Sequence, residues 1–166
     1  MFNLFDFNII SRKEKDILLK WIIKSENKFK KNVMGVNRKY YKFSHDPTSP
    51  KLLFEIKNRI FKREKIKSWV EEPMYQDYVG WISDGGYIHK HKDANFMSDV
   101  GVLKSVRYNL FLSVPHEGGD VIYGERNLKI KEGKYIKCNS GTEYHECSVV
   151  KGKKPRIVVS YGVLIR

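Results

Sequence analysis

The sequence predicts a mainly β domain, in which a closed or sandwiched β unit is backed by helices from the N-terminal part of the chain. Three observations lead to this prediction. Two stretches within the first 67 residues have the apolar spacing of amphipathic helices. From residue 75 onward the chain consists of short β-branched and aromatic runs, bounded by Gly, Asp, Asn or Pro. No helix-period stretch separates these runs, so a parallel sheet of βαβ units is not expected.

The first helix is expected within residues 11–28, "SRKEKDILLKWIIKSENK". Ser11 is a good N-cap residue, and Glu14 three positions later completes the capping-box pattern. The apolar stripe of this helix recurs at helical spacing and consists of Ile17, Leu18, Trp21 and Ile22. We expect the stripe to pack on the outer face of the larger sheet, with the lysines left in water.

The second helix is expected within residues 49–69, where Ser49 would cap it and Pro50 would occupy its first turn. Its stripe, which we expect on the same face of the sheet, consists of Leu52, Leu53, Ile56, Ile60 and Phe61. The intervening stretch "NRKYYKFSHDPTSP" is aromatic and rich in turn residues. It predicts a loop or a short strand, with His45 as a turn residue.

Eight strands are expected in the rest of the chain. Their sequences are "YQDYVGWIS", "YIHKH", "RYNLFLSV", "DVIY", "LKI", "YIKC", "ECSVV" and "RIVVSYGVLI". Short strands at this density, following helices, are typical of a closed or double-layered β unit. The chain therefore divides into a helical part at about 11–67 and a β core at about 75–166.

The composition bounds the class of protein. A chain of 166 residues with 41% hydrophobic residues fits one globular domain, residues 1–166. Its two cysteines argue against a disulfide framework and favour a reducing, cytoplasmic location. No apolar run reaches the roughly 18 residues of a membrane helix, so no membrane association is expected. The opening "MFNLFDFNII" lacks a basic leader and predicts a first strand or a tucked-in arm rather than a secretion signal.

The net charge of +13 is concentrated in the helical part of the chain. Residues 12–67 hold 18 Lys or Arg against 6 Asp or Glu, whereas residues 68–166 hold 14 against 12. Nucleic acid or an acidic protein is one possible partner of such a surface. A solvated lysine-rich face is the favoured interpretation, because the basic residues are mostly Lys without the Arg–aromatic interleaving of base recognition.

The stretch "GYIHKHKDAN" holds candidate metal ligands. His91 and Asp93 are two positions apart, so on a strand they point to one face. With one distant histidine they would form the two-histidine, one-carboxylate triad of non-haem Fe(II) oxygenases. His89 lies on the same face, so spacing alone leaves the register open. The distant histidine could be any of His45, His116 and His145.

Three segments taken in order make the pattern more specific. They are "HKDAN", "RYNLFLSVPHEGGDVIY" and "KIKEGKYIKCNSGTEYHECSVVKGKKPRIVVSYGV". Over residues 78–166 the chain resembles the 2-oxoglutarate- and Fe(II)-dependent dioxygenase superfamily, above all its prolyl-4-hydroxylase-like branch. That resemblance implies a double-stranded β-helix, a jelly-roll or cupin-like core, that uses Fe(II), 2-oxoglutarate as cosubstrate, and O2.

The resemblance also implies roles for individual residues. His91 and Asp93 match the family's H-x-D ligands, and His145 matches its distal histidine. Arg156 matches the basic residue that binds the far carboxylate of 2-oxoglutarate, which a guanidinium fork suits. An intact Asp93 favours hydroxylation, because related halogenases have a small residue at that position.

Further cosubstrate-binding residues are expected on three strands. Ser160 lies four positions after Arg156 on the same strand face and would add a hydrogen bond. Asn109 and Ser113 would line the cosubstrate pocket from the "RYNLFLSV" strand. Trp81 stands near the position where some relatives have a cosubstrate-binding tyrosine, which is a departure from the family pattern.

The resemblance implies a hydroxylase that acts on a residue of a peptide or protein. Two alternatives stay open within the superfamily, namely oxidation of a nucleic acid and oxidation of a small metabolite. An alternative of another class is a non-catalytic, cupin-type metal- or ligand-binding module. The sequence does not indicate an oligomeric state.

Overall fold

The computed structural model of the chain describes residues 8–74, 76–99 and 101–166. Within these residues the helices are α1 (Arg12–Lys24) and α2 (Lys51–Arg63), with a 3-10 turn, η1 (Glu26–Lys28), after α1. The strands are β1 (Lys30–Lys31), β2 (Gly35–Lys42), β3 (Val70–Glu71), β4 (Tyr78–His91), β5 (Phe96–Ser98), β6 (Gly101–Ser113), β7 (Val121–Tyr123), β8 (Arg126–Leu128), β9 (Tyr135–Cys138), β10 (His145–Cys147) and β11 (Arg156–Ile165). The first strand or arm expected at the N-terminus falls largely on residues 1–7, outside the described residues.

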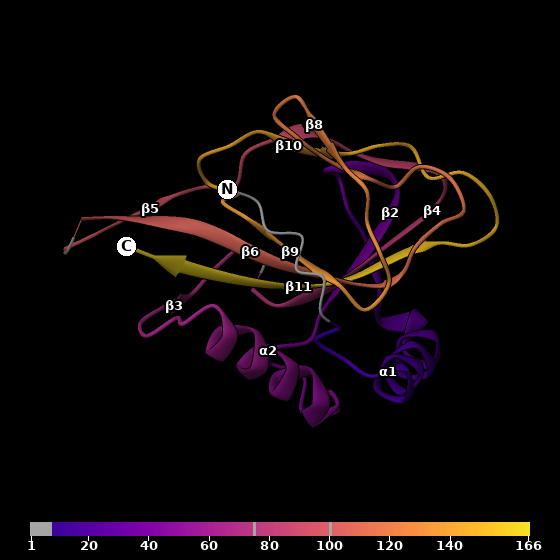
Figure 1. Cartoon of the computed structure of the whole chain (residues 1–166), viewed down its shortest axis with the longest axis horizontal. Helices are drawn as coiled ribbons and strands as arrows, with labels where there is room; N and C mark the ends of the chain where they lie inside the picture. Colours follow the sequence, from indigo (N-terminus) through magenta and orange to yellow (C-terminus); the bar gives the residue numbers. More distant parts are fainter. Residues whose placement is uncertain (1–7, 75, 100) are drawn as a thin grey trace.

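The strands pair in antiparallel fashion around β4 and β11. Their order is β5-β6-β11-β4-β10-β7-β8, with β9 beside β6, β2 beside β4, β3 beside β11 and β1 beside β2. Figure 1 shows a layer of long strands that includes β6, β9 and β11, with α1 and α2 on one side and β8 and β10 on the other. The prediction of a mainly β fold with flanking helices is confirmed.

The two faces of the long strands have different surroundings, because successive side chains point to opposite sides. On β11, Ile157, Val159 and Tyr161 belong to the largest apolar cluster, which also contains the helix stripes. Arg156 and Val158 on the same strand line a cavity on the opposite face. The layer therefore has a core on its helix side and a functional cavity on its other side.

The helix stripes pack against the sheet as the sequence predicts. The stripe residues that are fully buried in the largest cluster are Leu18, Ile22, Leu53, Ile56 and Ile60. Trp21 and Leu52 are partly buried against the same cluster, whereas Ile17 is 45% exposed. The helices thus contribute directly to the core that holds the long strands together.

The two helices begin differently from one another. Ser11 caps α1 with the expected capping box, in which its side chain accepts from the Glu14 N–H and the Glu14 carboxylate accepts from the Ser11 N–H. The N-cap expected for α2, Ser49, is wrong by one residue. Pro50 stands at the N-cap without a side-chain hydrogen bond, and the Ser49 hydroxyl donates to the Phe43 carbonyl at 3.0 Å.

Some of the basic residues in the helical part form ion pairs within the fold. The ion pairs that involve them are Lys15–Glu132, Lys28–Asp46, Lys39–Glu26, Lys57–Asp77 and Arg59–Glu14. Of these, only Lys57–Asp77 is buried, with both side chains less than a tenth exposed. Two of these pairs, Lys15–Glu132 and Lys57–Asp77, join the helical part to residues outside it.

Part of the sheet comes from segments that the sequence does not clearly mark. The stretch expected as a loop or short strand forms β2, eight residues long, which pairs with β4. Residues 78–83 of the run "YQDYVGWIS" and the run "YIHKH" lie on one strand, β4, and the β5–β6 hairpin was not expected. Of the helices that the structure describes, none is long and apolar enough to cross a membrane.

Removing buried atoms from the helix stripes should lower the stability of the whole domain. Ile60 is fully buried in the largest cluster, so Ile60→Ala should reduce the free energy of unfolding by about 2–5 kcal/mol. Ile23, 58% exposed on α1, provides the matched control, and Ile23→Ala should change stability by less than about 0.5 kcal/mol. Urea titrations of both variants measure the difference; equal losses would contradict the role of α2 as a buttress.

Candidate metal centre

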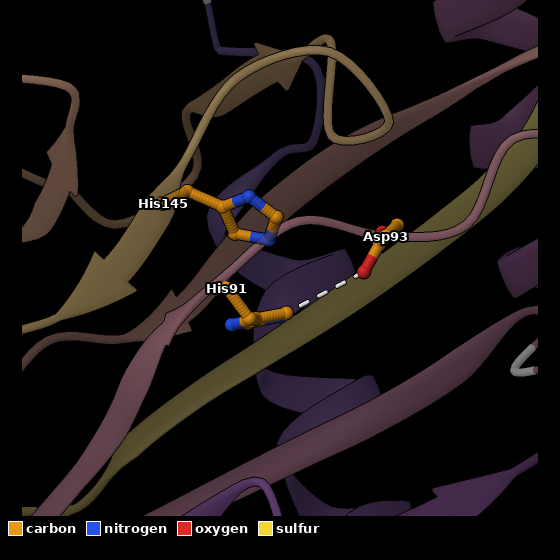
Figure 2. A group of neighbouring side chains, drawn as sticks. All are labelled: His91, Asp93 and His145. Atoms are coloured by element: carbon orange, nitrogen blue, oxygen red, sulfur yellow. Dashed lines mark ion pairs between the residues drawn. The ribbon is translucent and has the colours of Figure 1, made fainter.

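Two histidines meet where β10 pairs with β4. The antiparallel register places His145 directly opposite His91. Asp93 lies two residues beyond the end of β4, in a segment whose Asp93 N–H donates to the Ser140 carbonyl at 2.8 Å. One ligand atom from each of the three residues lies within 4.8 Å of the others. Figure 2 shows the three side chains gathered at one point, with Asp93 reaching it from the segment after the strand rather than from the strand itself.

Backbone carbonyls fix both imidazole rings. Nδ1 of His91 lies 2.7 Å from the His89 carbonyl oxygen, and Nδ1 of His145 lies 3.2 Å from the Glu143 carbonyl oxygen. A carbonyl only accepts, so each Nδ1 carries the proton and each Nε2 keeps a free lone pair. A hydrogen bond from the ring nitrogen that does not bind the metal is what orients histidine ligands in metal sites.

The charge states of the site suit metal binding. Burial and the neighbouring His91 lower the pKa of His145 below its ordinary value, which keeps this imidazole neutral near pH 7. Burial by itself raises the pKa of Asp93, but the positive charge of Arg107 outweighs it and the pKa lies below its ordinary value. The centre therefore offers the neutral imidazole of His145 and the carboxylate of Asp93 beside the imidazole of His91.

Arg107 on β6 holds the carboxylate of Asp93 in place. Its Nε donates to Asp93 Oδ2 at 2.8 Å, while Asp93 Oδ1 faces His91 Nε2 at 3.6 Å. The same guanidinium forms an ion pair with the buried Glu72 and donates to the Gln76 carbonyl at 3.2 Å. One carboxylate oxygen is thus occupied by Arg107, and the other stays directed at the centre.

The structure distinguishes the candidate histidines. His89 is exposed, and its ring lies edge-on to Tyr87 with centroids 5.0 Å apart, so the triad uses His91. His45 and His116 are exposed and do not belong to the cluster. His145 is the distant histidine that completes it.

The triad opens into a cavity of about 260 Å³ between the layers. Apolar side chains such as Ile82, Val121 and Val158 form part of its wall. Arginines from three different strands also line it, namely Arg38, Arg107 and Arg156. A cavity with apolar walls and a few converging charges is typical of a site for a small charged molecule.

Arg156 lies in this cavity without a carboxylate partner. The residue is 4% exposed, and its guanidinium carbon lies 5.1 Å from the centroid of the Phe111 ring. Over the part of the chain that the structure describes, no carboxylate forms an ion pair with it, and its buried Nε has no hydrogen-bond partner. A buried cation in this state is suited to an anionic ligand.

Two of the other expected cosubstrate residues, Asn109 and Ser160, lie opposite each other on β6 and β11. Asn109 lines the cavity, and its amide lies 3.7 Å from the Cys138 sulfur. Ser160 pairs with both Tyr78 and Asn109 across neighbouring strands and is fully buried. Its hydroxyl has no partner among the described residues, and Ser160 is not one of the residues that line the cavity.

The other two expected cosubstrate residues do not line the cavity. The Ser113 hydroxyl donates to the Pro155 carbonyl at 2.7 Å, which joins the end of β6 to the start of β11. Trp81 points to the helix side of β4, where Lys39 lies 4.3 Å above its ring. The alternation of β4 is the reason, because it directs Tyr78 and Ile82 to the cavity and Trp81 away from it.

Sequence reasoning missed Arg107, Glu72 and Tyr78. Arg107 carries a signal that points to it, because it is the single charge in the strand segment "SVRYNLFLS", where a buried ion must be paired. Glu72 has no such signal, since it lies in the turn after β3 and reaches Arg107 across 35 residues of sequence.

Comparison with known proteins gives a fold but no sequence family. No protein-family model and no curated protein sequence matches the chain. Among solved structures, the viral collagen prolyl hydroxylase vCPH of Paramecium bursaria Chlorella virus-1, in complex with 2OG, is similar with a TM-score of 0.72. The identity is 19%, over 99% of this chain and 96% of that one.

Two further solved structures are also similar in fold. A prolyl hydroxylase from Trichoplax adhaerens, in complex with a hypoxia inducible factor peptide fragment, matches with a TM-score of 0.72 and 12% identity, over 99% of this chain and 83% of that one. HygX from Streptomyces hygroscopicus, with nickel and 2-oxoglutarate bound, matches with a TM-score of 0.68 and 10% identity, over 95% and 80%. The expected double-stranded β-helix of the prolyl-4-hydroxylase type is therefore confirmed as the fold of this chain.

His91, and not His89, should be needed for metal binding. His91→Ala removes a donor of the triad, so binding of Mn(II) should fall below detection, whereas His89→Ala should leave it within about twofold. Titration calorimetry with Mn(II) makes the comparison in proteins of equal thermal stability. The reverse result would shift the ligand register by two residues.

Arg107 should act on the metal through Asp93. Arg107→Lys keeps the charge but loses the guanidinium fork, so Mn(II) affinity should fall by about 10–100-fold, the usual effect of disturbing a group that orients a ligand. Arg126→Lys on the exposed β8 is the matched control. Unchanged Mn(II) affinity in a stably folded Arg107→Lys protein would show that Arg107 serves stability alone.

Proposed function

We propose that this chain is an Fe(II)- and 2-oxoglutarate-dependent dioxygenase that hydroxylates a residue of a peptide or protein. One observation carries the proposal. The His91–Asp93–His145 cluster and the buried, unpaired Arg156 face the same cavity. A metal centre with a separate cation at one cavity is what a chelating 2-keto dicarboxylate requires.

The donor set fits Fe(II). Two imidazole nitrogens and one carboxylate oxygen from one side leave about three coordination positions open, as in the two-histidine, one-carboxylate oxygenases. A closed tetrahedral zinc site has four protein ligands, and only three gather within the described residues. When bound, the iron would supply the binding and activation of O2 while 2-oxoglutarate is converted to succinate and CO2.

The residues around the metal would position the cosubstrate. Arg156 would bind the far carboxylate bidentately, held flat by the Phe111 ring below it. Ser160 and Asn109 offer a hydroxyl and an amide on the same side of the sheet. The apolar wall that includes Val158 suits the methylene groups between the two carboxylates and keeps water away from them.

The similar structures support both the cosubstrate and the substrate class. One similar protein is a 2OG complex, and another holds nickel together with 2-oxoglutarate. The match covers 96% of the viral prolyl hydroxylase, and the Trichoplax adhaerens prolyl hydroxylase was solved with a peptide fragment. A peptide or protein residue is therefore the substrate class we propose, with proline as the first residue to test.

The function itself is tested by product formation. Protein loaded with Fe(II), in the presence of ascorbate and O2, should convert 2-oxoglutarate to succinate. A peptide substrate should gain 16 mass units in the same reaction. His145→Ala is the matched inactive control, because it removes one ligand of the cluster. A purified protein that holds tetrahedral zinc and forms no succinate with any Fe(II) loading would support a non-catalytic binding module instead.

Loss of Arg156 should separate cosubstrate binding from metal binding. Arg156→Ala should weaken 2-oxoglutarate binding by about 2–5 kcal/mol, because it leaves a carboxylate buried without its cation. Mn(II) affinity should stay within about twofold, since Arg156 is not part of the ligand cluster. Arg126→Ala controls for the lost charge, and equal 2-oxoglutarate affinity in Arg156→Ala and wild type would refute the assignment.

A further inference from the structure

One of the three arginines that line the cavity, Arg38, has no role in the proposed function. We propose that Arg38 binds a carboxylate of the substrate, so that the enzyme selects a substrate with an acidic group beside the site of hydroxylation. This inference rests on the proposed function and specifies its substrate class. Arg38 lies on β2, outside the strands that carry the metal ligands and Arg156.

A break in strand pairing directs Arg38 into the cavity. The β2–β4 register runs from Val36 opposite Tyr87 to Arg38 opposite Ile82, with a shift between Val36 and Arg38. At the shift Asn37 has φ 44°, in the left-handed region, and its amide donates to the Asp84 carbonyl at 2.8 Å. Bulges of this kind often occur next to active sites, where they re-aim a side chain.

The guanidinium of Arg38 is held by neutral groups only. One terminal nitrogen donates to Asn32 Oδ1 at 3.0 Å, and the other lies 3.5 Å from the Tyr78 hydroxyl. Its buried Nε has no hydrogen-bond partner among the residues described by the structure, and none of their carboxylates forms an ion pair with it. The cation is therefore positioned but not neutralised.

The turn before β2 fixes this position in advance. Asn32 is 8% exposed, and its side-chain oxygen accepts from both the Met34 N–H and Arg38. The Asn32 N–H in turn donates to the Arg38 carbonyl at 3.1 Å. Met34 and Arg38 both line the cavity, so one buried amide organises this part of its wall. An arginine ordered before its ligand arrives loses little entropy on binding.

The other cations of the cavity already have a partner or a proposed one. Arg107 is neutralised by Asp93 and Glu72. Arg156 is the proposed partner of the cosubstrate, and Lys92 is exposed to water with its ammonium 4.5 Å from the Tyr144 ring centroid. Arg38, which is partly buried, is thus the arginine of the cavity that has neither an ion-pair partner among the described residues nor a proposed one, and it is available to an anion of the substrate.

A carboxylate is the anion that the proposed chemistry best supplies. A peptide can present it as the side chain of Asp or Glu beside the hydroxylated residue. A free amino acid presents the same group on the oxidised molecule itself. In both cases the guanidinium fork offers two parallel donors to two carboxylate oxygens.

The test compares acidic ligands with their neutral amides in protein loaded with Mn(II) and 2-oxoglutarate. Proline-centred peptides are made in pairs with Glu or Gln at each neighbouring position, and N-acetylproline is paired with N-acetylprolinamide. Calorimetry should show that wild type binds the acid of at least one pair at least about tenfold more tightly, as one charge-assisted hydrogen bond provides. A preference among the peptides identifies a peptide side chain as the source, and one for N-acetylproline identifies a free amino acid.

Two variants at position 38 assign the preference to this residue. Arg38→Gln should reduce the acid-to-amide ratio to about one, and Arg38→Lys should leave an intermediate ratio because it keeps the charge without the fork. Lys39→Gln is the matched control, since it removes a neighbouring positive charge on the helix side of β2, and it should keep the wild-type ratio. Thermal unfolding of all variants shows that the loaded proteins are folded.

The outcomes keep the two proposals apart. Equal affinities for acid and amide in every pair, in wild type, would overturn the role of Arg38, whatever the succinate assay shows. So would a loss of 2-oxoglutarate affinity in Arg38→Gln as large as in Arg156→Ala, because Arg38 would then bind the cosubstrate. An acid preference that depends on Arg38 in a protein that never forms succinate would instead retain this site and refute the hydroxylase.

Discussion

The register between β10 and β4 is the constraint on which the metal centre depends. It sets His145 opposite His91, although β10 is only three residues long and its pairing with β4 becomes irregular before Cys147. Because side chains alternate along a strand, a slip of one residue would turn His145 away from the cavity. β10 is held from its other side as well, where β7 pairs with all three of its residues. The short strand is thus fixed between two neighbours.

The metal centre also requires that charged side chains be accommodated inside the fold. The long strands give apolar side chains to the helix-facing core, and they give both apolar and charged side chains to the cavity. Arg107 is the most deeply embedded of these charges, and its three polar contacts tie β6 to the metal-binding segment and to the turn after β3. A buried cation with fewer contacts would destabilise the sheet, whereas this one orients the ligand carboxylate.

The fold is shared with oxygenases that have 9–19% identity to this chain. Such divergence is compatible with one fold, because a core requires the right pattern and volume rather than particular residues. Function requires more, since a site depends on specific groups at specific positions. In this chain the groups that stand out are the triad, the unpaired Arg156 and the unpaired Arg38.

The sequence by itself determined the elements whose signals are local. The Ser11 capping box, the helix stripes, and the bounds of β9 and β11 all follow from spacing and residue type within about twenty positions. The order of the motifs, together with their resemblance to a known superfamily, also pointed to His91, Asp93, His145 and Arg156. All four face one cavity in the structure.

The tertiary structure decided everything that depends on which face of an element is inside. It distinguished His91 from His89, turned Trp81 toward the helices, and joined Arg107 to Glu72 across 35 residues. Alternation along a strand tells which side chains share a face, but the pairing of distant strands decides what that face meets. Ion pairs and cavities are formed by such distant partners, and for that reason no local pattern contains them.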